Sequence, residues 1–440
     1  MMKDKQSSSK FDFDAVYDEL VVPHFQELES LDSRRKNSSY SISDVCKSGF
    51  AVYSLKAPSL LAFRPKTPAE KSNLRACFGI SELPSDSGLR KILDGVDSME
   101  MRKVFDKTFQ YLEDQQVVSE YKIMSDSILL SIDGVHHYSS KSVKCDCCLT
   151  KKHRDGTTTY SHSMLSAAMV CPGKSEVFIV DNEPIVQQDG EVKNDCERNA
   201  GKRLLRRIKE IHGSKSIVYA MDALYGCGPI IDLIKTSSPN WSYIINAKED
   251  GHQHLFTQFD ENNEKGKVEW KNWRRKEGTF EVGWINGLSL NASRQDLNVN
   301  MLIVNLKGKK GKVTTFHYLT DIDLKKENVM EVLSAGRSRW KIENEVFNTL
   351  KNQQYNFEHN FGHGQQFLAT NFAYLMMLAF NVDQIRQYGS RIFRSIWKGL
   401  KSKREVWDAF RVTFKMVIAS SIDDLAHKLL SIYELKMIRV

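Results

Sequence analysis

Residues 127–133 read SILLSID, a short apolar run that ends on Asp133. Residues 216–222 repeat the pattern with SIVYAMD, which ends on Asp222. Continuous apolar runs of this length are typical of strands that are buried on both faces. Helical patterns at about residues 196–211 and 228–236 surround the second run, and SYIINA at 242–247 indicates another strand. This alternation predicts an α/β protein with a mixed or parallel sheet flanked by helices.

Asp133 and Asp222 share one feature, because each ends an apolar strand in this interpretation. In open α/β sheets, ligands gather at the carboxyl ends of strands, where side chains leave the core together. An acid at such a point is costly to bury unless a cation or a partner compensates its charge. Either acid alone would be interpreted as a cap of the turn after its strand. Two together predict a site for oxygen-loving cations such as Mg²⁺ or Mn²⁺.

A third carboxylate is expected in GRSRWKIENEVFNTLK, residues 336–351. On a helix, Arg339 and Glu343 are four residues apart and therefore share one face, beside the apolar stripe. Glu345 points roughly 200° away from Glu343, so the two cannot serve the same site. We favour Glu343 as the third metal ligand, because it has the arginine on its face. A surface salt bridge between Arg339 and Glu343 is the alternative.

Three blocks of the sequence resemble those of bacterial insertion-sequence transposases of the DDE class. They are SIDGVHHYSS, VYAMDALYGCGPIIDLI and RWKIENEVFNTLKNQQYNFEHNFGHG. The resemblance covers residues 125–365 well and the N-terminal helices more loosely. It implies an RNase H-like mixed sheet flanked by helices, with a β-rich insertion between the second aspartate and the glutamate. Asp133, Asp222 and Glu343 fall on the three metal-binding acids of the family.

The resemblance further implies an enzyme that cleaves the ends of its element and joins them to target DNA. The acids would hold Mg²⁺ or Mn²⁺, two ions per site, for in-line attack by water or a 3′-hydroxyl on a phosphodiester. Arg339 would orient Glu343 or clamp a phosphate of the DNA end. The expected partners are the terminal inverted repeats and the target DNA, bound by a homodimer that pairs two element ends.

One departure concerns the family's signature of tyrosine, arginine, glutamate and lysine. Arg339 and Glu343 fit this signature. Gly336 stands at the tyrosine position and Leu350 at the lysine position, with Lys351 one step later. Lys351 is therefore the nearest residue for the phosphate-binding role of the lysine.

Tryptophans of the expected insertion are further candidates, because related transposases stack one on a flipped base at the DNA end. The candidates are Trp270, Trp273 and Trp284, with Arg274 and Arg275 alongside for phosphates. Stacking on an aromatic ring is an effective way to hold an unpaired base. Packing across a β-sheet is the alternative for each tryptophan.

The pattern divides the chain into regions. We expect disorder over 1–12, a DNA-binding helical domain over 13–122, the catalytic core over 123–249 and 321–365, a β-rich insertion over 250–320, and a basic helical region over 366–440. A purely structural helical cap is the alternative for the N-terminal helices.

The C-terminal region is strongly basic. Between Arg386 and Lys415, nine basic residues face two acids, with aromatic residues interleaved. A concentrated positive face favours binding to a nucleic-acid phosphate backbone, since each neutralised phosphate releases a counterion. Arg394, Lys398 and Lys401 are the expected DNA contacts. A solvated helical surface whose aromatics face the core is the alternative.

One cysteine-rich stretch contains half of a possible structural Zn²⁺ site, although core thiols are the more common role of such cysteines. KCDCCL contains a C-x-x-C pair, Cys145 and Cys148. His162 and Cys196 would complete a four-ligand site if the intervening strands fold back. Reduced thiols in the core are the alternative.

Two histidines follow the segment of Glu343 closely, in EHNFGHG. His359 and His363 are candidates for binding phosphate or metal, and the glycines beside them predict a tight turn. A histidine in a polar turn is more often simply solvated.

The composition excludes several classes of protein. The 8 cysteines among 440 residues do not form a disulfide framework, and residues 367–382 predict a buried helix rather than a membrane span. The polar start lacks a secretory signal, so we expect a cytoplasmic protein. The sequence contains no glycine-rich phosphate loop, which argues against a nucleotide-dependent metabolic enzyme. Two alternatives to a transposase stay open, a metal nuclease without strand transfer and a catalytically silent DNA-binding relic.

Overall fold

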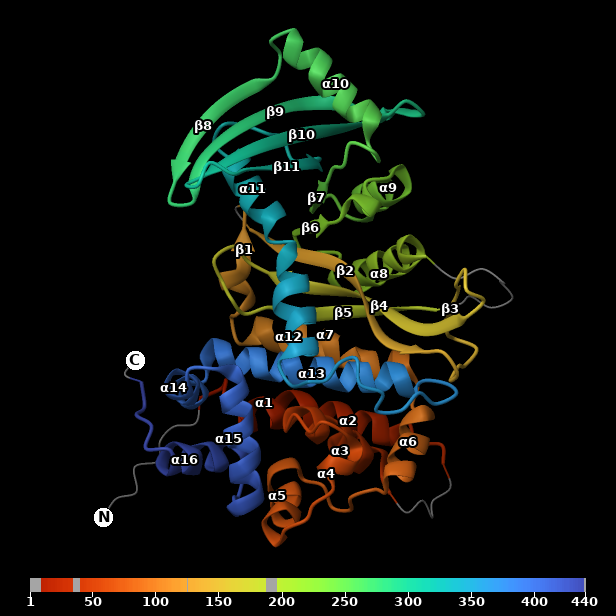
Figure 1. The fold of residues 1–440 in the computed structure, drawn as a ribbon, viewed down its shortest axis with the longest axis vertical. Helices are drawn as coiled ribbons and strands as arrows, with labels where there is room; N and C mark the ends of the chain where they lie inside the picture. The colour runs from red at the N-terminus through yellow and green to blue at the C-terminus, as the bar shows by residue number, and fades with distance from the viewer. Residues whose placement is uncertain (1–8, 35–39, 125, 187–195, 439–440) are drawn as a thin grey trace.

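The computed structural model describes all residues except 1–8, 35–39, 125, 187–195 and 439–440. Most of the segment expected to be disordered, residues 1–8, lies outside the described residues. The described chain is a mixed α/β fold with one large sheet and helices packed around it (Figure 1). Its strands are β1 (Lys122–Ile123), β2 (Ser127–Ser140), β3 (Leu149–Lys152), β4 (Thr158–Val170), β5 (Phe178–Ile185), β6 (Ile217–Met221), β7 (Trp241–Asn246), β8 (Glu269–Arg275), β9 (Gly278–Asn291), β10 (Arg294–Gly308) and β11 (Val313–Thr320).

The sheet runs in the order β3-β4-β2-β6-β7-β11-β10-β9-β8, with β1 beside β2 and β5 beside β4. Strands β2, β6 and β7 are parallel, and the other described pairings are antiparallel. The two apolar runs are therefore neighbouring central strands. Residues 128–132 and all of β6 are buried, as continuous apolar sequence predicts.

Three helices pack on the central strands. Helix α8 (Glu197–His212) connects β5 to β6, and α9 (Gly228–Ser237) connects β6 to β7. Helix α8 contacts β5 and α9, while α9 contacts β7, and α11 (Val329–Arg337) contacts β6 and β7. The helices expected at about 196–211 and 228–236 are confirmed.

One long helix, α13 (Leu368–Gly389), is buried between the sheet and the helical half of the molecule (Figure 1). One of its buried polar side chains, Asn381, pairs with the backbone of the sheet. Asn381 accepts a hydrogen bond from the backbone N–H of Ile179 at 2.9 Å and donates one to the carbonyl of the same residue at 2.8 Å. Both backbone groups of this β5 residue are thereby paired, which docks α13 on the sheet. Within the described residues, no helix combines the length and apolarity that a membrane crossing requires.

The N-terminal and C-terminal helices pack together beyond α13 (Figure 1). Helix α3 contacts α13, α15 contacts α5, and α16 contacts α1. A buried ion pair joins the N-terminal helical region to α13, because Lys56 Nζ lies 2.6 Å from Asp383 Oδ2. The helices are α1 (Phe13–Val16), α2 (Val22–Ser30), α3 (Ile42–Ser54), α4 (Leu60–Phe63), α5 (Pro68–Phe78), α6 (Asp86–Asp94), α7 (Ser98–Asp114), α14 (Arg391–Leu400), α15 (Lys403–Met416) and α16 (Ile422–Ile432).

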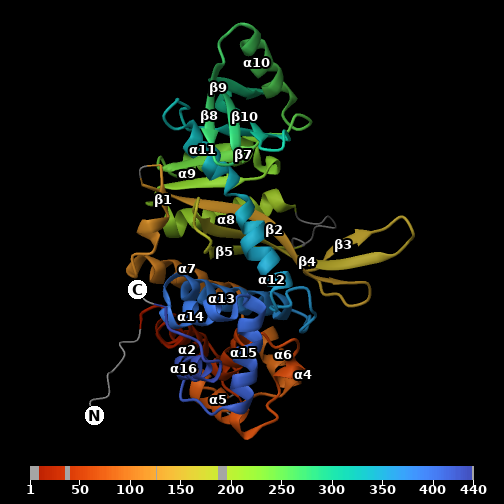
Figure 2. The same ribbon diagram turned by 60° about the vertical axis from the view of Figure 1, so that its left-hand side comes forward.

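The segment between β7 and α11 extends the sheet at the far end from the helical half (Figure 2). Strand β11 pairs with β7, and β10, β9 and β8 follow in antiparallel order. These four strands lie where a β-rich insertion is expected. Helix α10 (Gln253–Glu264) is not anticipated by the sequence, and it packs on β9 through Leu255 and Phe259.

Candidate active site

Asp133 and Asp222 lie level with each other on neighbouring parallel strands. The register of β2 and β6 places Ser131 opposite Ala220, and each acid lies two residues further on. Neighbouring strands are about 4.8 Å apart, so the two side chains start close together. Asp222 directly follows β6, as predicted. The predicted strand end at Asp133 is wrong, because β2 continues to Ser140 along β4.

The ending of β6 explains why Asp133 is still accessible within a continuous strand. Beyond Met221 the β6 side of β2 has no strand neighbour in the described sheet. The side chains of Asp133 and Asp222 are 20% and 35% exposed, respectively. Lys248, after β7, is the cation nearest to Asp222, with 3.8 Å between Lys248 Nζ and Asp222 Oδ2.

Arg339 connects Asp133 to Glu343. Its Nη1 lies 3.0 Å from Asp133 Oδ2 and 2.8 Å from Glu343 Oε1. The arginine side chain is only 5% exposed, and its backbone carbonyl accepts a hydrogen bond from Ser131 Oγ at 2.8 Å. Charge-assisted bonds at this burial are stronger than surface pairs, so the guanidinium fixes both carboxylates at one place. The alternative of a simple surface salt bridge does not fit this burial.

Glu343 lies in a π-helical turn, Ile342–Phe347, which continues into α12 (Asn348–Asn352). Wider turns of this kind are frequent at functional sites. The expected four-residue contact with Arg339 is present. Glu345 points elsewhere, since its charge acts on Lys403 of α15. Glu343 is therefore the glutamate that shares a site with Asp133.

Burial and a hydrogen bond shared with Glu343 raise the pKa of Asp133 to about 7, and the guanidinium of Arg339 opposes this shift. A backbone N–H also favours the ionised form, because Gly134 N donates to Asp133 Oδ1 at 2.9 Å. Two carboxyl groups held this close cannot both ionise freely unless further positive charge enters.

This raised pKa predicts a pH-dependent affinity for Mn²⁺. Below about pH 7 the folded protein keeps a proton on Asp133, and a cation that binds there must displace it. We expect the affinity to fall by about tenfold for each pH unit below 7 and to level off above it. Titration of Mn²⁺ followed by electron paramagnetic resonance would measure this. Glu345→Gln is the control and should leave the profile unchanged. An affinity that does not change with pH would contradict the arrangement.

A fourth carboxylate, which the sequence reasoning missed, borders the site. Glu197 begins α8, and its Oε2 lies 2.9 Å from the position that a Cβ on Gly134 would occupy. Tyr225 donates a hydrogen bond to Glu197 Oε1 at 3.0 Å. Burial raises the pKa of Glu197, and the charge of Asp222 adds to the shift. Gly134 is the feature of the sequence that reflects this contact, because a larger residue at this position would displace Glu197.

Trp340 is a second residue that the sequence reasoning missed. Its side chain is 51% exposed, and the Arg339 guanidinium lies 5.1 Å from its ring centroid. An exposed tryptophan beside these acids offers a stacking surface for a base. Its position next to Arg339 was visible in the sequence, but its exposure was not.

The candidate tryptophans of the insertion differ in exposure. Trp284 is 1% exposed, so its ring packs within the sheet and does not face DNA. Trp270 packs against Gly283 and donates to Asn263 Oδ1 at 2.8 Å. Trp273 is half-buried, and the neighbouring Arg274 and Arg275 are exposed. Trp273 is thus the candidate whose surroundings best fit a DNA contact.

Basic residues of the helical half separate into internal and exposed groups. Arg102 is buried and paired with Asp106 and Asp181, so it supports the fold. On α14, the candidates Arg394 and Lys398 are exposed, as is Lys401 at its end. The aromatic residues interleaved with them are mostly buried: Phe393, Trp407, Phe410 and Phe414. Lys351 of α12 pairs with Glu358 at 2.9 Å.

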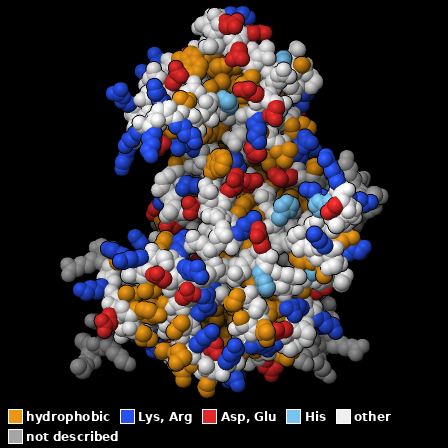
Figure 3. Space-filling view, viewed as in Figure 1, with side chains coloured by type: hydrophobic (Ala, Val, Ile, Leu, Met, Phe, Trp, Pro, Cys, Tyr) orange, Lys and Arg blue, Asp and Glu red, His pale blue; other side chains and the backbone are white. Residues whose placement is uncertain are grey.

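Acidic side chains gather at the middle of one face of the molecule, with Lys and Arg side chains above and below them (Figure 3). A polyanion that crosses this face would meet positive charge on both sides of the acids.

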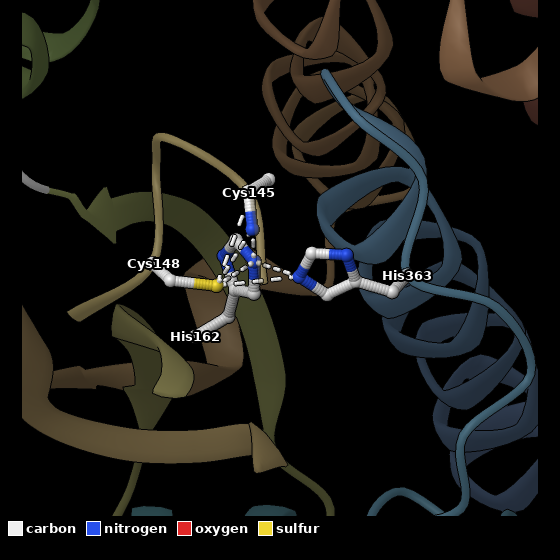
Figure 4. Close-up of side chains that lie close together, drawn as sticks. All are labelled: Cys145, Cys148, His162 and His363. Atoms are coloured by element: carbon white, nitrogen blue, oxygen red, sulfur yellow. Dashed lines mark hydrogen bonds between the residues drawn. The ribbon is translucent and has the colours of Figure 1, made fainter. Parts of the chain in front are cut away.

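Cys145, Cys148 and His162 come together as predicted, but the fourth member of the group is His363 (Figure 4). Their ligand atoms all lie within 4.8 Å of one another. Cys196, the predicted fourth ligand, is exposed at the start of α8 and is not in this group. His359 lies outside the group as well, and its ring packs edge-on against Phe361 at 4.8 Å.

No family model and no curated protein matches the chain. Among solved structures, the chain is similar to a piggyBac transposase in a cryo-EM synaptic complex with hairpin DNA. The identity is 12% and the TM-score 0.41, over 96% of this chain and 79% of the other.

Proposed function

We propose that this protein is a DDE-class DNA transposase whose RNase H-like core holds divalent cations at Asp133, Asp222 and Glu343. The observation that carries the proposal is the bridge from Arg339 to Asp133 and Glu343. Arg339 and Asp133 are separated by 206 residues in sequence, yet their side chains meet beside Asp222. Two acids from separate elements on one buried arginine, with a third acid level with one of them beside the next strand, have no evident structural purpose.

The donor set fits hard divalent cations. Carboxylate oxygens are the ligands that Mg²⁺ and Mn²⁺ prefer, and two acids project from adjacent strands. When bound, such ions stabilise the charge that develops on the attacking and leaving oxygens of a phosphodiester. Asp133, Asp222 and Glu343 would hold them. Glu197 would border the site, where burial raises its pKa.

Arg339 has two roles in this proposal. It holds Asp133 and Glu343 together against their mutual repulsion, and it keeps their oxygens oriented through its nearly complete burial. Its contact with the Trp340 ring places an exposed aromatic beside the carboxylates. A displaced base that stacks on Trp340 would bring its neighbouring phosphate close to the acids.

The proposed partners are the element's terminal inverted repeats and target DNA. Exposed basic residues on α14 and beside Trp273 supply positive charge on two separate parts of the molecule. The proposal includes a homodimer, since two DNA ends must be paired before they are joined.

A strand-transfer assay tests the proposed function. Purified protein is incubated with linear DNA that carries the element ends, a plasmid target, and Mg²⁺ or Mn²⁺. A transposase nicks at the element boundary and joins the 3′-hydroxyl ends to the plasmid. Cleavage without joined product would favour a metal nuclease, and binding without cleavage in either metal would favour a silent DNA-binding relic.

The exposed face of α14 gives a separate prediction on DNA binding. We expect Arg394→Ala with Lys398→Ala to weaken binding and to lower the slope of log K against log salt by about 0.9 for each phosphate that is no longer neutralised. Fluorescence anisotropy at several salt concentrations would measure the slope. The matched control is Lys71→Ala with Arg75→Ala, an exposed pair at the same spacing on α5, which should change little. Equal effects of the two double variants would refute a specific role for α14.

A further inference from the structure

We propose that Cys145, Cys148, His162 and His363 form a structural Zn²⁺ site, separate from the carboxylates. The site would fasten the connection between β2 and β4 to the loop that follows α12. This inference stands independently of the proposed function, since it rests on four ligand atoms that take no part in the carboxylate cluster.

The distances between the four ligand atoms are those of a tetrahedron around zinc. Zinc–sulfur bonds of about 2.3 Å and zinc–nitrogen bonds of about 2.0 Å give edges of about 3.8 Å for S···S, 3.5 Å for S···N and 3.3 Å for N···N. The two sulfurs are 3.8 Å apart, and the two Nε2 atoms are 3.1 Å apart. The sulfur–nitrogen edges are 3.4 Å from His162 Nε2 to each sulfur and 3.3 Å from His363 Nε2 to Cys148 Sγ. Two sulfurs and two imidazole nitrogens therefore surround one point at bonding distance.

Hydrogen bonding fixes which nitrogen of His363 faces this point. Its Nδ1 lies 2.8 Å from the carbonyl oxygen of Gly364, so Nδ1 carries the proton and donates. Nε2 then presents a lone pair toward His162 Nε2. His162 Nε2 lies 3.1 Å from this lone pair, so a proton or a cation must lie between the two nitrogens. A backbone carbonyl behind a ligating imidazole is the usual arrangement at metal sites.

The C-x-x-C turn is arranged around its sulfurs. The backbone N–H of Cys148 donates to the carbonyl of Cys145 at 3.2 Å, which closes the turn. The backbone N–H of Cys145 donates to Cys148 Sγ at 3.4 Å, and such a bond stabilises a thiolate. Cys147, within the same turn, is not part of the four-atom group.

The chemistry and burial of the group select zinc in a structural role. Thiolate and imidazole ligands favour Zn²⁺ over the hard cations that carboxylates prefer. Cys148, His162 and His363 are 2%, 3% and 7% exposed. Four protein ligands, of which only Cys145 is partly exposed, leave no open position for a substrate, which is typical of structural zinc.

The position of the site links the segments that carry the catalytic candidates. His162 lies on β4 opposite Tyr138 of β2, the strand that carries Asp133. His363 lies in the loop after α12, and the backbone N–H groups that follow it at residues 365–368 donate to Asp94 of α6. Zinc would therefore hold the Asp133 strand, the end of the Glu343 segment and the helical half in one arrangement.

Metal analysis of the full chain tests this site. We expect one zinc per chain after gel filtration, measured by inductively coupled plasma mass spectrometry, in the wild type and equally in Asp133→Asn with Asp222→Asn. The second protein shows whether the zinc belongs to the carboxylates. Cys148→Ser and His363→Ala should lose the zinc. Cys147→Ser and Cys196→Ser are the matched controls and should retain it.

Cobalt substitution keeps the test valid if a variant does not fold. Wild-type protein reconstituted with Co²⁺ should show thiolate-to-cobalt charge transfer and the intense visible bands of a tetrahedral site. His363→Cys should retain cobalt and shift those bands, because a third sulfur replaces a nitrogen. Absence of zinc from folded wild-type protein purified from zinc-supplemented cultures would overturn the proposal. Loss of zinc in Cys196→Ser together with retention in His363→Ala would overturn the choice of ligands.

Discussion

Asp133→Asn and Asp222→Asn are each expected to lower the rate of DNA cleavage by about 1,000-fold or more, with DNA affinity changed by less than about twofold. An amide keeps the size of the carboxylate but removes the charge that holds a divalent cation. Metal ions contribute several kcal/mol to stabilising the transition state of phosphodiester attack. Each 1.4 kcal/mol, roughly, is a factor of ten in rate. Single-turnover cleavage of end-labelled DNA in Mg²⁺ would measure the loss.

The control for these two variants is Asp250→Asn, an exposed acid in the loop after β7. It should cleave at the wild-type rate. Glu343→Gln should resemble the two aspartate variants, whereas Glu345→Gln should not. If Asp222→Asn retained cleavage within about tenfold of the wild type, Asp222 would not be a metal ligand.

Arg339→Gln is expected to lower cleavage by about 100-fold, because misplacing a catalytic group by an ångström has this effect. Without the guanidinium, nothing else among the described contacts joins Asp133 to Glu343 by an ion pair. Their repulsion then raises the pKa of Asp133 further and moves the carboxylates apart. The loss should appear in kcat and in Mn²⁺ affinity, with KM for DNA nearly unchanged.

The matched control for Arg339 is Arg337→Gln, two residues earlier at the end of α11. Arg337 pairs with the exposed Glu277 at 2.8 Å and has no contact with the acids among the described ion pairs. It should cleave normally. Arg339→Lys should retain part of the activity, since an ammonium keeps the charge but cannot contact two carboxylates in one plane. Equal losses in Arg337→Gln and Arg339→Gln would contradict a positioning role.

Local features of the site could be predicted from the sequence, because they depend on neighbours along the chain. The apolar runs before Asp133 and Asp222 are buried strands, and the contact from Arg339 to Glu343 follows from four-residue spacing. The contact from Arg339 to Asp133 could not be predicted, because it depends on how α11 packs against the sheet. The position of Glu197 could not be predicted either, because it depends on how α8 packs against the sheet.

Sequence spacing predicted three members of the group Cys145, Cys148, His162 and His363 but not the fourth. The C-x-x-C turn and His162 lie on one hairpin, so local strand pairing brings them together. The fourth position was assigned to Cys196 because cysteine is a common zinc ligand. The structure places His363 there, because the loop after α12 folds back on the hairpin. His363 was a candidate for metal or phosphate from the sequence, but no pattern connected it to Cys145.

Tryptophan exposure could not be inferred from the sequence either. Trp284 and Trp273 lie in similar β segments, yet Trp284 is buried and Trp273 is half-buried. Both side chains lie on one face of the insertion, because Trp273 pairs with Phe280 of β9 and its ring centroid is 6.3 Å from that of Trp284. Trp284 is on β9, between β8 and β10, whereas Trp273 is on β8, the last strand of the sheet. The sequence does not show which strand lies at the edge, so this difference in exposure could not be predicted.

Anomalous scattering from crystals soaked in Mn²⁺ tests the central claim most directly, because it locates the metal without relying on activity. We expect an anomalous peak within about 2.2 Å of carboxylate oxygens of both Asp133 and Asp222, at the side where Glu343 lies. The peak should vanish in Asp133→Asn crystals. Manganese bound elsewhere on the chain, with no peak between Asp133 and Asp222, would contradict the proposed catalytic site.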